Sequence, residues 1–530
     1  MTEELKTKYL AAGFVTNTYG NLTTFEVAPA DIIAVAGNLY HEHNLPLKLI
    51  TALDERKEHG KLKVMYIFGV PSENEFIAPY ILTDKEFPSL TPTIHEANAY
   101  ERKIMSFFGI TALGHPDPRP MILHENWPAN VHPLRKDFNV TTRPDRTTGH
   151  YEFTHIQGEG IYEIPVGPVH AGIIEPGHFR FNVAGEEILN LEGRLGYSHK
   201  GSEKLFETLP LAEKIKLSER ISGDTSFSHS HAFIRALEKL SDTHVSERTR
   251  YLRTIFSELE RIACHSGDIG MILMDTGFSF GGMHGARLRE SIMRWNEKLS
   301  GSRFLRGVNT IGGIQKDVAD SLLAELKTFL TGFEKDFNEV IGVAGNSSSV
   351  LNRLEGTGIL DRTIAKDHGV TGIAGRACGI DRDTRRDFPY AAYPYLQMTV
   401  AKANTCDVLA RYSIRVQEVR NSITIIREAI EKMPKIVIGS SSTITALPHK
   451  KLSEIIFKPN SYVVSIVEGW RGDLVHFVAT DSAGHITRVD VRDPSFLNWT
   501  AVGYAGRGNM VPDFPLINKS FNLSYTGNDL

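Results

Sequence analysis

Cysteine is scarce in this sequence. Only Cys264, Cys378 and Cys406 occur among 530 residues, and they lie far apart along the chain. Structural zinc sites and iron–sulfur clusters use several cysteines at short, regular spacings, so the sequence contains no local motif for either. If this protein works with an iron–sulfur cluster, another protein must supply that cluster.

Other features that would define a class of protein are also missing. No run of about 18 uncharged apolar residues occurs, so we do not expect a transmembrane segment. The first residues, Met-Thr-Glu-Glu-Leu-Lys, lack the pattern of a signal peptide. A net charge of −4 gives no indication of nucleic-acid or anionic-lipid binding. No Gly-x-Gly-x-x-Gly segment follows a predicted strand, which argues against direct NADH binding.

The remaining composition, with 41% hydrophobic and 23% charged residues, is typical of a globular protein. A chain of this length predicts roughly two to four domains. Residues 63–70 and 76–82 are β-rich runs that predict buried strands, and apolar residues recur at helical spacing in 97–108. Repeated prolines between 114 and 138 predict an extended chain without regular structure.

The polar segment 139–160 predicts a junction between a first domain, residues 1–145, and a second, residues 160–530. The second domain begins with a pattern that predicts a small antiparallel sheet and then becomes mostly helical. We expect its longest helix over residues 397–433, because apolar residues keep a helical period there and Pro434 ends it. A β-rich tail follows. The fold class is therefore α+β, with an α/β domain before a mostly helical one.

The first domain contains an ordered set of residues. The set comprises Glu101-Arg102, Phe107-Phe108-Gly109-Ile110, Gly114-His115-Pro116 and His132-Pro133-Leu134-Arg135-Lys136-Asp137-Phe138. It resembles the smaller peripheral-arm subunit that neighbours the quinone-site subunit of respiratory complex I. The resemblance implies a docking domain stiffened by prolines, without chemistry of its own.

The second domain contains a longer ordered set, which extends to the end of the chain. It includes Gly167-Pro168-Val169-His170, Glu175-Pro176-Gly177-His178-Phe179-Arg180, and segments within 196–204, 371–390 and 511–525. This set resembles the quinone-site subunit of complex I and the large subunit of membrane-bound group 4 hydrogenases. A fusion of the two domains in this order is similar to the large subunit of formate hydrogenlyase-type complexes.

Residues 220–229 and 493–498 resemble the two signature segments of the nickel–iron hydrogenase large subunit, each of which carries a Cys-x-x-Cys pair. Nickel and iron in that centre need anionic sulfur ligands, which hydroxyl and amide oxygens do not replace. Three dispersed cysteines cannot supply four thiolates. We therefore expect this chain to bind no metal centre or other cofactor of its own. The four vacated ligand positions are held by Ser222, Thr225, Ser495 and Asn498.

Two alternatives for a bound ligand stay open. Carboxylate and imidazole groups suit non-haem iron, manganese or zinc, so a substitute metal site is one of them. Its ligands would be Asp224, His229, His170 and Glu175.

Quinone is the second alternative for a bound ligand. The resemblance places Pro176 and Gly223 where complex I carries the histidine and tyrosine that bond the quinone carbonyls, and neither can donate such a bond. His170 or His178 could take that part.

The catalytic candidates are Glu175, His178 and His170. Glu175 occupies a position that resembles a proton-transfer glutamate beside the hydrogenase metal, and a carboxylate with a raised pKa in a cleft can relay protons. The alternative is structural, with Glu175 as a capping carboxylate and both histidines bonded to the backbone.

Two arginines are candidates for contact with a partner's cluster. Arg220 matches an arginine beside the terminal iron–sulfur cluster of the small subunit, and Arg306 falls where complex I carries a histidine that faces the cluster. A permanent cation there would favour the reduced cluster without the pH dependence of histidine. The alternative is that each arginine pairs with a carboxylate.

The charged segment that contains Arg376, Asp383 and Arg385 predicts a buried network that fixes a loop beside the cleft. In the families that this chain resembles, such a loop lies close to the active cleft and to the path that couples it to the membrane arm. A structural or coupling role is therefore expected for these three residues.

The resemblance implies a subunit of a membrane-associated, ion-translocating oxidoreductase complex, which takes part in electron transfer. The expected partners are an iron–sulfur small subunit, a ferredoxin-like subunit and membrane-arm subunits, with this chain in the cytoplasm, peripheral on the inner face of the cell membrane. The iron–sulfur cluster would belong to the partner. The alternative is a non-catalytic scaffold that couples the iron–sulfur module to an antiporter-like membrane arm.

Overall fold

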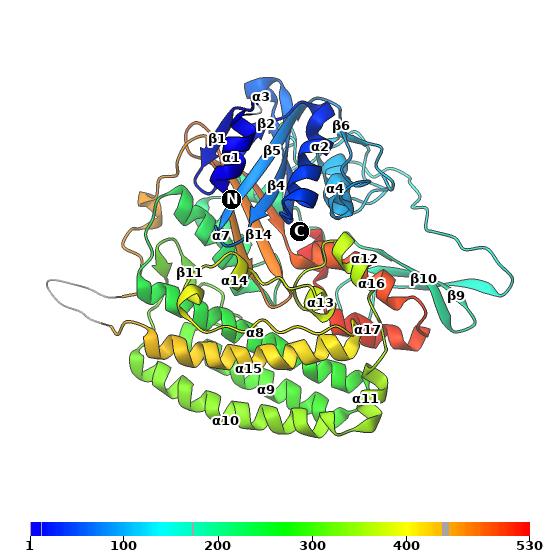
Figure 1. Ribbon diagram of the computed structural model, residues 1–530, viewed down its shortest axis with the longest axis vertical. Coiled ribbons are helices and arrows are strands. Elements are labelled where there is room, and N and C mark those ends of the chain that lie inside the picture. Colours follow the sequence, from blue (N-terminus) through cyan, green and yellow to red (C-terminus); the bar gives the residue numbers. More distant parts are fainter. Residues whose placement is uncertain (1, 12, 172–173, 437–444) are drawn as a thin grey trace.

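The computed structural model describes residues 2–11, 13–171, 174–436 and 445–530. Figure 1 shows an N-terminal sheet at the top, a second sheet from the C-terminal part of the chain in the middle, and long helices at the bottom. Helices and strands are segregated within this arrangement. The expected α+β class is confirmed.

The N-terminal domain is built on a five-stranded sheet in the order β1-β2-β5-β4-β3. Strands β2 and β5 are parallel, whereas the other neighbours are antiparallel. The two expected strands are confirmed as parts of β4 and β5, and the expected helix is confirmed as α4 (Asn98–Phe108). The strands are β1 (Thr16–Tyr19), β2 (Leu22–Glu26), β3 (Leu47–Glu55), β4 (Lys61–Val70) and β5 (Glu75–Thr83).

Between Leu113 and Ile161 the chain forms no helix or strand, as the prolines predict. It then enters a three-stranded antiparallel sheet, which confirms the expected small sheet. These strands are β8 (Ile161–Val166), β9 (His178–Ala184) and β10 (Glu187–Arg194). The β9–β10 hairpin projects at one side of the molecule (Figure 1).

The β-rich C-terminal segment lies at the centre of the molecule. It forms the antiparallel sheet β13-β14-β15, and every residue of β14 is buried. Because side chains alternate between the two faces of a strand, Val463 and Val478 pack under α7, whereas Val464 and Phe477 pack against the N-terminal domain. The elements are β13 (Tyr462–Glu468), β14 (Asp473–Thr480), β15 (Ile486–Arg492) and α7 (Ser226–Leu240).

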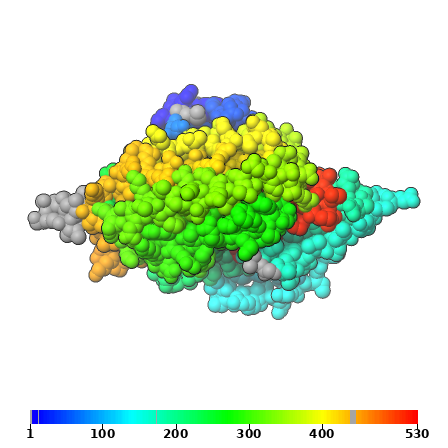
Figure 2. Space-filling view, turned by 90° about the horizontal axis from the view of Figure 1, so that it is seen from below, coloured from blue at the N-terminus to red at the C-terminus, as the bar shows by residue number. Residues whose placement is uncertain are grey.

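Four long helices form the layer below this sheet: α8 (Glu247–Asp275), α9 (Ser279–Ser300), α10 (Asp320–Gly345) and α15 (Val408–Lys432). Residues that recur every three or four positions are buried on α8, among them Leu252, Ile255, Leu259 and Ile262. Figure 2, seen from below, shows the outer helices of this layer as one continuous face.

The expected length of one helix is wrong. Helix α15 begins at Val408 instead of 397 and has 25 residues, so the 29-residue α8 is the longest. The side chain of Asp407 accepts a hydrogen bond from the Ala410 N–H and so caps α15. Cys406 has a φ of 63°, which a continuous helix does not allow. Residues 397–407 therefore run outside the helix, although their apolar residues keep the same period.

Shorter elements connect these layers, and several bring site residues into place. The shorter helices are α1 (Thr2–Ala11), α2 (Ile32–Gly37), α3 (Arg56–His59), α5 (Ser202–Thr208), α6 (Leu211–Ser218), α11 (Ser348–Leu354), α12 (Arg362–Asp367), α13 (Gly372–Ala377), α14 (Thr384–Asp387), α16 (Pro494–Gly506), α17 (Phe514–Phe521) and α18 (Tyr525–Asp529). The short strands are β6 (Glu86–Pro88), β7 (Thr111–Leu113), β11 (Asn309–Thr310) and β12 (Gly313–Ile314).

Buried ion pairs join the N-terminal domain to the rest of the chain. Lys103 on α4 contacts Glu203 at 2.7 Å and Asp490 at 2.9 Å. Lys48 on β3 contacts Asp473 on β14 at 2.9 Å. All five side chains are less than a tenth exposed, so the two parts of the chain meet across a dry, charge-matched interface.

Candidate functional site

A cavity of about 510 Å³ lies where the first signature segment meets the segment around α17 and α18. Its walls come from the segment before β9, the turn before α7, helices α8 and α9, the turn after β13 and the segment around α17 and α18. Residues that carry its chemistry include Glu175, Ser222, Asp224, Cys264, Arg289 and Arg471. The cavity is thus assembled from separate parts of the sequence.

An ion pair between Asp224 and Arg471 forms one wall of the cavity. Two guanidinium nitrogens of Arg471 each lie 2.7 Å from one carboxylate oxygen of Asp224, in the bidentate arrangement that gives strong pairing. Arg471 also donates to the Thr225 hydroxyl at 3.1 Å and stacks on Trp470. Burial by itself would raise the pKa of Asp224, but Arg471 outweighs it and holds this pKa at about 2. The pair therefore stays charged at physiological pH.

Two of the four vacated ligand positions belong to the first signature segment, and both side chains bond to Asp224. The Ser222 hydroxyl donates to an Asp224 oxygen at 2.9 Å and contacts the Ser524 hydroxyl at the same distance. The Thr225 hydroxyl donates to Asp224 at 3.1 Å. Both side chains are therefore engaged within the protein.

The other two vacated positions, Ser495 and Asn498, lie at the start of α16. The Ser495 hydroxyl accepts a hydrogen bond from the Ser524 N–H at 2.9 Å. The Asn498 amide bonds both backbone groups of Thr371, at 3.0 and 3.1 Å. These oxygen and amide groups do not fit a nickel–iron centre, which needs thiolates.

The one cysteine in the cavity wall does not replace the missing thiolates. Cys264 is buried, and its thiol donates to the Asp224 carbonyl at 3.3 Å. Burial raises the pKa of this thiol well above its ordinary value, and the Asp224 carboxylate raises it further. A single thiol cannot supply the four thiolates of a nickel–iron centre.

The structure separates the three catalytic candidates. Glu175 lines the cavity, and its carboxylate accepts a hydrogen bond from the Thr526 N–H at 3.1 Å. His170 and His178 do not line it. The His170 ring contacts the Gly177 carbonyl at 2.7 Å, and the His178 ring contacts the Gly167 carbonyl at 3.2 Å. Of the three, only Glu175 is placed to meet a molecule in the cavity.

The residues of the alternative metal site are not brought together. The two ring nitrogens of His229 contact His476 at 3.2 Å and Asp493 at 3.0 Å. Among the described residues, no group of three or more His, Cys, Asp or Glu side chains is arranged to hold a metal ion. Gly223 and Pro176 occupy the positions that resemble the quinone-binding tyrosine and histidine of complex I. Gly223 lines the cavity, whereas Pro176 does not.

Arg220 and Arg306 are both exposed, near the start of α7. Arg220 donates to the Lys216 carbonyl at 2.8 Å, and Arg306 approaches the Ser226 hydroxyl at 3.4 Å. Within the described ranges neither arginine forms an ion pair with a carboxylate. Both guanidinium groups act electrostatically on the Glu219 carboxylate from beyond ion-pair distance, and both are exposed at the surface.

Arg376 and Asp383 belong to a buried network of charges, as the sequence predicts. Arg376 pairs with Glu418 on α15 and, at 2.8 Å, with Glu468 on β13, and it lies 3.7 Å from Asp383. Each of these side chains is at most 1% exposed. Guanidinium groups so deep in the protein require such partners.

Arg385 extends the network toward α8. It contacts Asp383 at 2.7 Å and Glu258 at 3.2 Å, and Glu258 also accepts hydrogen bonds from Tyr393 and Ser422. Sequence reasoning missed Glu258, although it falls in the apolar stripe of α8, between Ile255 and Leu259. A carboxylate on that face is a detectable signal of a buried ion pair.

Sequence reasoning also missed Arg289 and Arg471, two of the basic residues in the cavity wall. Arg471 lies 247 positions from its partner Asp224. Arg289, on α9, faces Cys264 and forms no ion pair with another described residue. Only the packing of α8 against α9 brings this second arginine to the cavity.

No helix in the described ranges combines the length and apolar character that crossing a membrane requires. Together, the N-terminal domain, the long helical layer and the modified signature segments define a fused large subunit of an oxidoreductase complex. The particular family follows from comparisons with known proteins.

Residues 25–144 match the family of the respiratory-chain NADH dehydrogenase 30 Kd subunit, and residues 275–529 match that of the 49 Kd subunit. The chain is 33% identical to formate hydrogenlyase subunit 5 of Escherichia coli (strain K12), over 93% of this chain and 86% of that protein. It is 33% identical to hydrogenase-4 component G of the same organism, over 93% and 85% of the two chains.

A third relative is the fused C/D protein of the NADH-quinone oxidoreductase of Phocaeicola vulgatus, which is 30% identical over 81% of this chain and 84% of the relative. This chain therefore belongs to the family of fused 30 Kd and 49 Kd subunits that the formate hydrogenlyase, hydrogenase-4 and NADH-quinone oxidoreductase proteins share. The expected family and the expected class, a component of an oxidoreductase complex, are confirmed.

Proposed function

We propose that this chain carries the reaction cavity of a membrane-associated, ion-translocating redox complex. An iron–sulfur small subunit would supply or accept electrons beside Arg220 and Arg306, and a ferredoxin-like subunit and membrane-arm subunits would complete the assembly. The chain would lie on the cytoplasmic, inner face of the membrane. The observation that carries the proposal is the cavity of about 510 Å³, lined by Glu175, the Asp224–Arg471 pair and Ser222, one of the four positions that resemble the metal ligands of nickel–iron hydrogenases.

In this proposal the protein's own residues orient a substrate and move its protons. Glu175 faces the cavity and keeps one bond to the backbone, so its carboxylate is positioned and still accessible. Arg289 and the Asp224–Arg471 pair offer fixed charges that can orient a polar molecule in the low-dielectric cavity. Electrons would come from the partner's cluster. Quinone is one such substrate, although Gly223 lacks the hydroxyl that would bond its carbonyl.

Replacing Glu175 by glutamine tests this proposal in the assembled complex. The glutamine oxygen can still accept the bond from the Thr526 N–H, but the side chain no longer transfers a proton at neutral pH. We expect turnover to fall by about 10²- to 10⁴-fold, the usual contribution of a general acid or base. The matched control is Glu186→Gln, which changes an exposed glutamate in the β9–β10 turn and should leave turnover unchanged.

Unchanged turnover in Glu175→Gln would contradict a chemical role for the cavity. Elemental analysis of the same complex supplies a separate check, because stoichiometric nickel would contradict the proposal that the four substituted positions hold no metal. A hydrogen-evolution assay, run alongside, should give no activity.

The charge of Arg306 leads to a prediction about the midpoint potential of the partner's cluster. The arginine stays charged throughout the physiological range, so the midpoint potential of the neighbouring cluster should be nearly independent of pH. In Arg306→His the side chain loses its charge as the pH rises through about 6.5. Since the cation favours the reduced cluster, the midpoint potential should then fall with rising pH, by at most about 59 mV per pH unit.

Redox titration of the complex between pH 5.5 and 8.5 measures this slope. Arg362→His, at an exposed position on α12, is the control and should reproduce the flat profile. A steep slope in the unmodified complex would show that Arg306 does not control the cluster.

A second function, as a coupling scaffold, is favoured by the buried network around Arg376. Its charges connect β13, α15 and α8 with the loop that contains Asp383 and Arg385. A rearrangement at any of these elements would change the pairing at the others. If Glu175→Gln leaves turnover intact, this non-catalytic function becomes the better account.

A further inference from the structure

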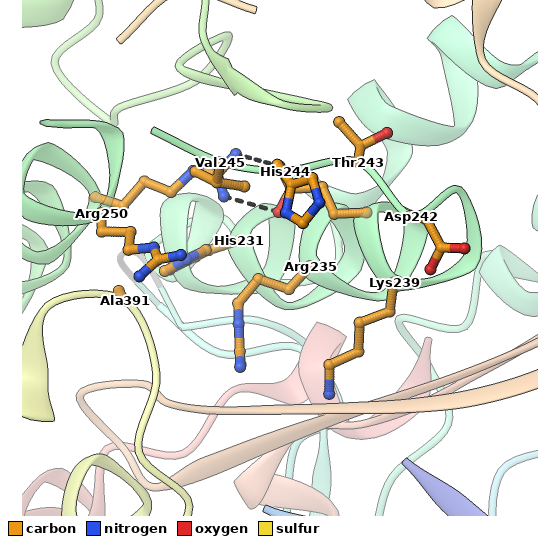
Figure 3. Close-up of a pocket in the computed structure, with 11 residues that line it drawn as sticks. His231, Arg235, Lys239, Asp242, Thr243, His244, Val245, Arg250 and Ala391 are labelled. Carbon is orange, nitrogen blue, oxygen red and sulfur yellow. Dashed lines mark hydrogen bonds and ion pairs between the residues drawn. The ribbon is translucent and has the colours of Figure 1, made fainter. Parts of the chain in front are cut away.

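A second cavity, separate from the one lined by Glu175, lies beside the C-terminal half of α7 (Figure 3). It has a volume of about 400 Å³, within the range of small-molecule sites. Its lining is strongly basic and comes from α7, the turn after it and the start of α8. The basic residues are His231, Arg235, Lys239, His244, Arg250 and Arg253.

The two acidic residues of this basic cavity are already engaged. Both oxygens of Glu238 contact Arg253, at 2.7 and 3.0 Å. Asp242 contacts Lys458 at 2.7 Å. Both carboxylates therefore form their ion pairs with cations other than Arg235 and Lys239, although Glu238 also attracts Arg235 from a greater distance. The positive charge of the cavity is still not balanced by the described residues that line it.

Arg235 and Lys239 lie one helical turn apart, and Figure 3 shows their side chains extending side by side from α7. Arg235 donates to the Ile466 carbonyl at 2.7 Å and lies over the Tyr390 ring. Lys239 has only a long contact of 3.5 Å to the Val464 carbonyl. Both side chains are partly buried, and neither forms an ion pair with a described residue, although a cation withdrawn from water is usually paired.

Two further features of the basic cavity favour an anion as its ligand. His231 is 1% exposed, yet its Nδ1 atom has no hydrogen-bond partner among the described residues, which is uncommon for a buried polar atom. Burial lowers the pKa of Lys239 to about 7, and the neighbouring Arg235 contributes in the same direction. Burial also lowers the pKa of Arg235 to about 10. An anion in the cavity would stabilise the charged forms of Lys239 and Arg235 and so raise both pKa values.

We propose that the basic cavity binds a small phosphate-type anion between Arg235 and Lys239. A guanidinium with several donors beside an ammonium group is well suited to the oxygens of such an anion. His231 supplies a further ring nitrogen, and Arg250 an additional charge at the edge of the cavity. The position of Arg235 and Lys239 one turn apart on one face of α7 favours a compact anion over an extended acidic peptide.

The full-length chain can be tested with inorganic phosphate as the probe, in buffer with matched ionic strength. Isothermal titration should give one site, and phosphate should raise Tm. In the double variant Arg235→Met/Lys239→Met the affinity should fall at least tenfold and the Tm shift should vanish. Lys335→Met, which removes an exposed lysine on α10, is the control and should bind like the wild type.

Lys239→Met alone separates an anion site from a structural role. If Lys239 belongs to an anion site, removing it without phosphate should leave Tm unchanged or higher, because an unpaired and partly buried charge is lost. Lys239→Arg should keep phosphate binding. A lower Tm for Lys239→Met in phosphate-free buffer would overturn the proposal.

A parallel measurement with phosphatidylglycerol vesicles identifies the source of the phosphate group. Vesicle binding that disappears in the double variant, without a response to free phosphate, would identify a lipid headgroup as the ligand. A response to free phosphate alone would identify a dissolved anion. If neither probe binds the wild type, or the double variant binds both equally, the proposal is wrong.

Discussion

Arg376→Met is expected to cost about 3–5 kcal/mol of unfolding free energy, the usual loss when one partner of a buried charge network is removed. Methionine fills most of the space but leaves Glu418 and Glu468 without their shared guanidinium. Both carboxylates are 1% exposed and cannot recover water. Urea unfolding at pH 8, followed by circular dichroism, measures the change.

The same segment contains a matched control. Arg386 also pairs with two carboxylates, Asp381 and Asp387, but its side chain is 43% exposed. Since exposed pairs contribute about 0–1 kcal/mol, Arg386→Met should change stability by less than about 1 kcal/mol. Equal losses in Arg376→Met and Arg386→Met would show that burial does not govern this network.

The cost of Arg376→Met should also depend on pH. Burial raises the pKa of Glu468 to about 7, and removing Arg376 should raise it further. A carboxyl group whose pKa is higher in the folded than in the unfolded state stabilises the fold at low pH. This stabilisation is lost as the pH rises through the folded-state pKa. The variant should therefore lose more stability at pH 8 than at pH 5.5.

Lys103→Met is expected to weaken the attachment of the N-terminal domain. The lysine neutralises Glu203 and Asp490, and all three side chains are at most 8% exposed. Removing it leaves Arg488 as the remaining cation that pairs with both carboxylates. The expected loss is again about 3–5 kcal/mol.

Urea unfolding and limited proteolysis together measure this effect. Because Lys103 joins the two parts of the chain, Lys103→Met should also speed cleavage in the segment 139–160. Lys57→Met, which removes an exposed lysine on α3, is the control and should change neither measurement. Normal stability of Lys103→Met would show that the apolar contacts between the two sheets hold the domain without this ion pair.

Much of the local structure could be predicted from the sequence. The strands around Val64 and Ile77, the helix that contains Ile104, the small antiparallel sheet and the irregular proline-rich segment all occur as expected. Each depends on side chains only a few residues apart. The start of α15 was misplaced because the apolar period continues through residues 397–407, whereas the cap at Asp407 decides the boundary. The boundary between the two expected domains stays a prediction.

The candidate site was only partly predictable. Sequence reasoning identified Glu175 and the four substituted ligand positions because they fall in recognisable segments. It could not find Arg471, the partner of Asp224, because 247 positions separate the two residues. Nor could it choose among Glu175, His170 and His178, since only the course of the chain before β9 shows which side chain faces the cavity.

The sequence by itself determined the family, the position along the chain of most helices and strands, and the absence of four cysteines, because each is set by residue identity or by short-range spacing. The tertiary structure decided that the C-terminal sheet lies at the centre, that Arg471 neutralises Asp224, and that Arg235 and Lys239 have no carboxylate partner among the described residues. Buried charges need partners nearby in space, and folding can supply these from any distance along the chain.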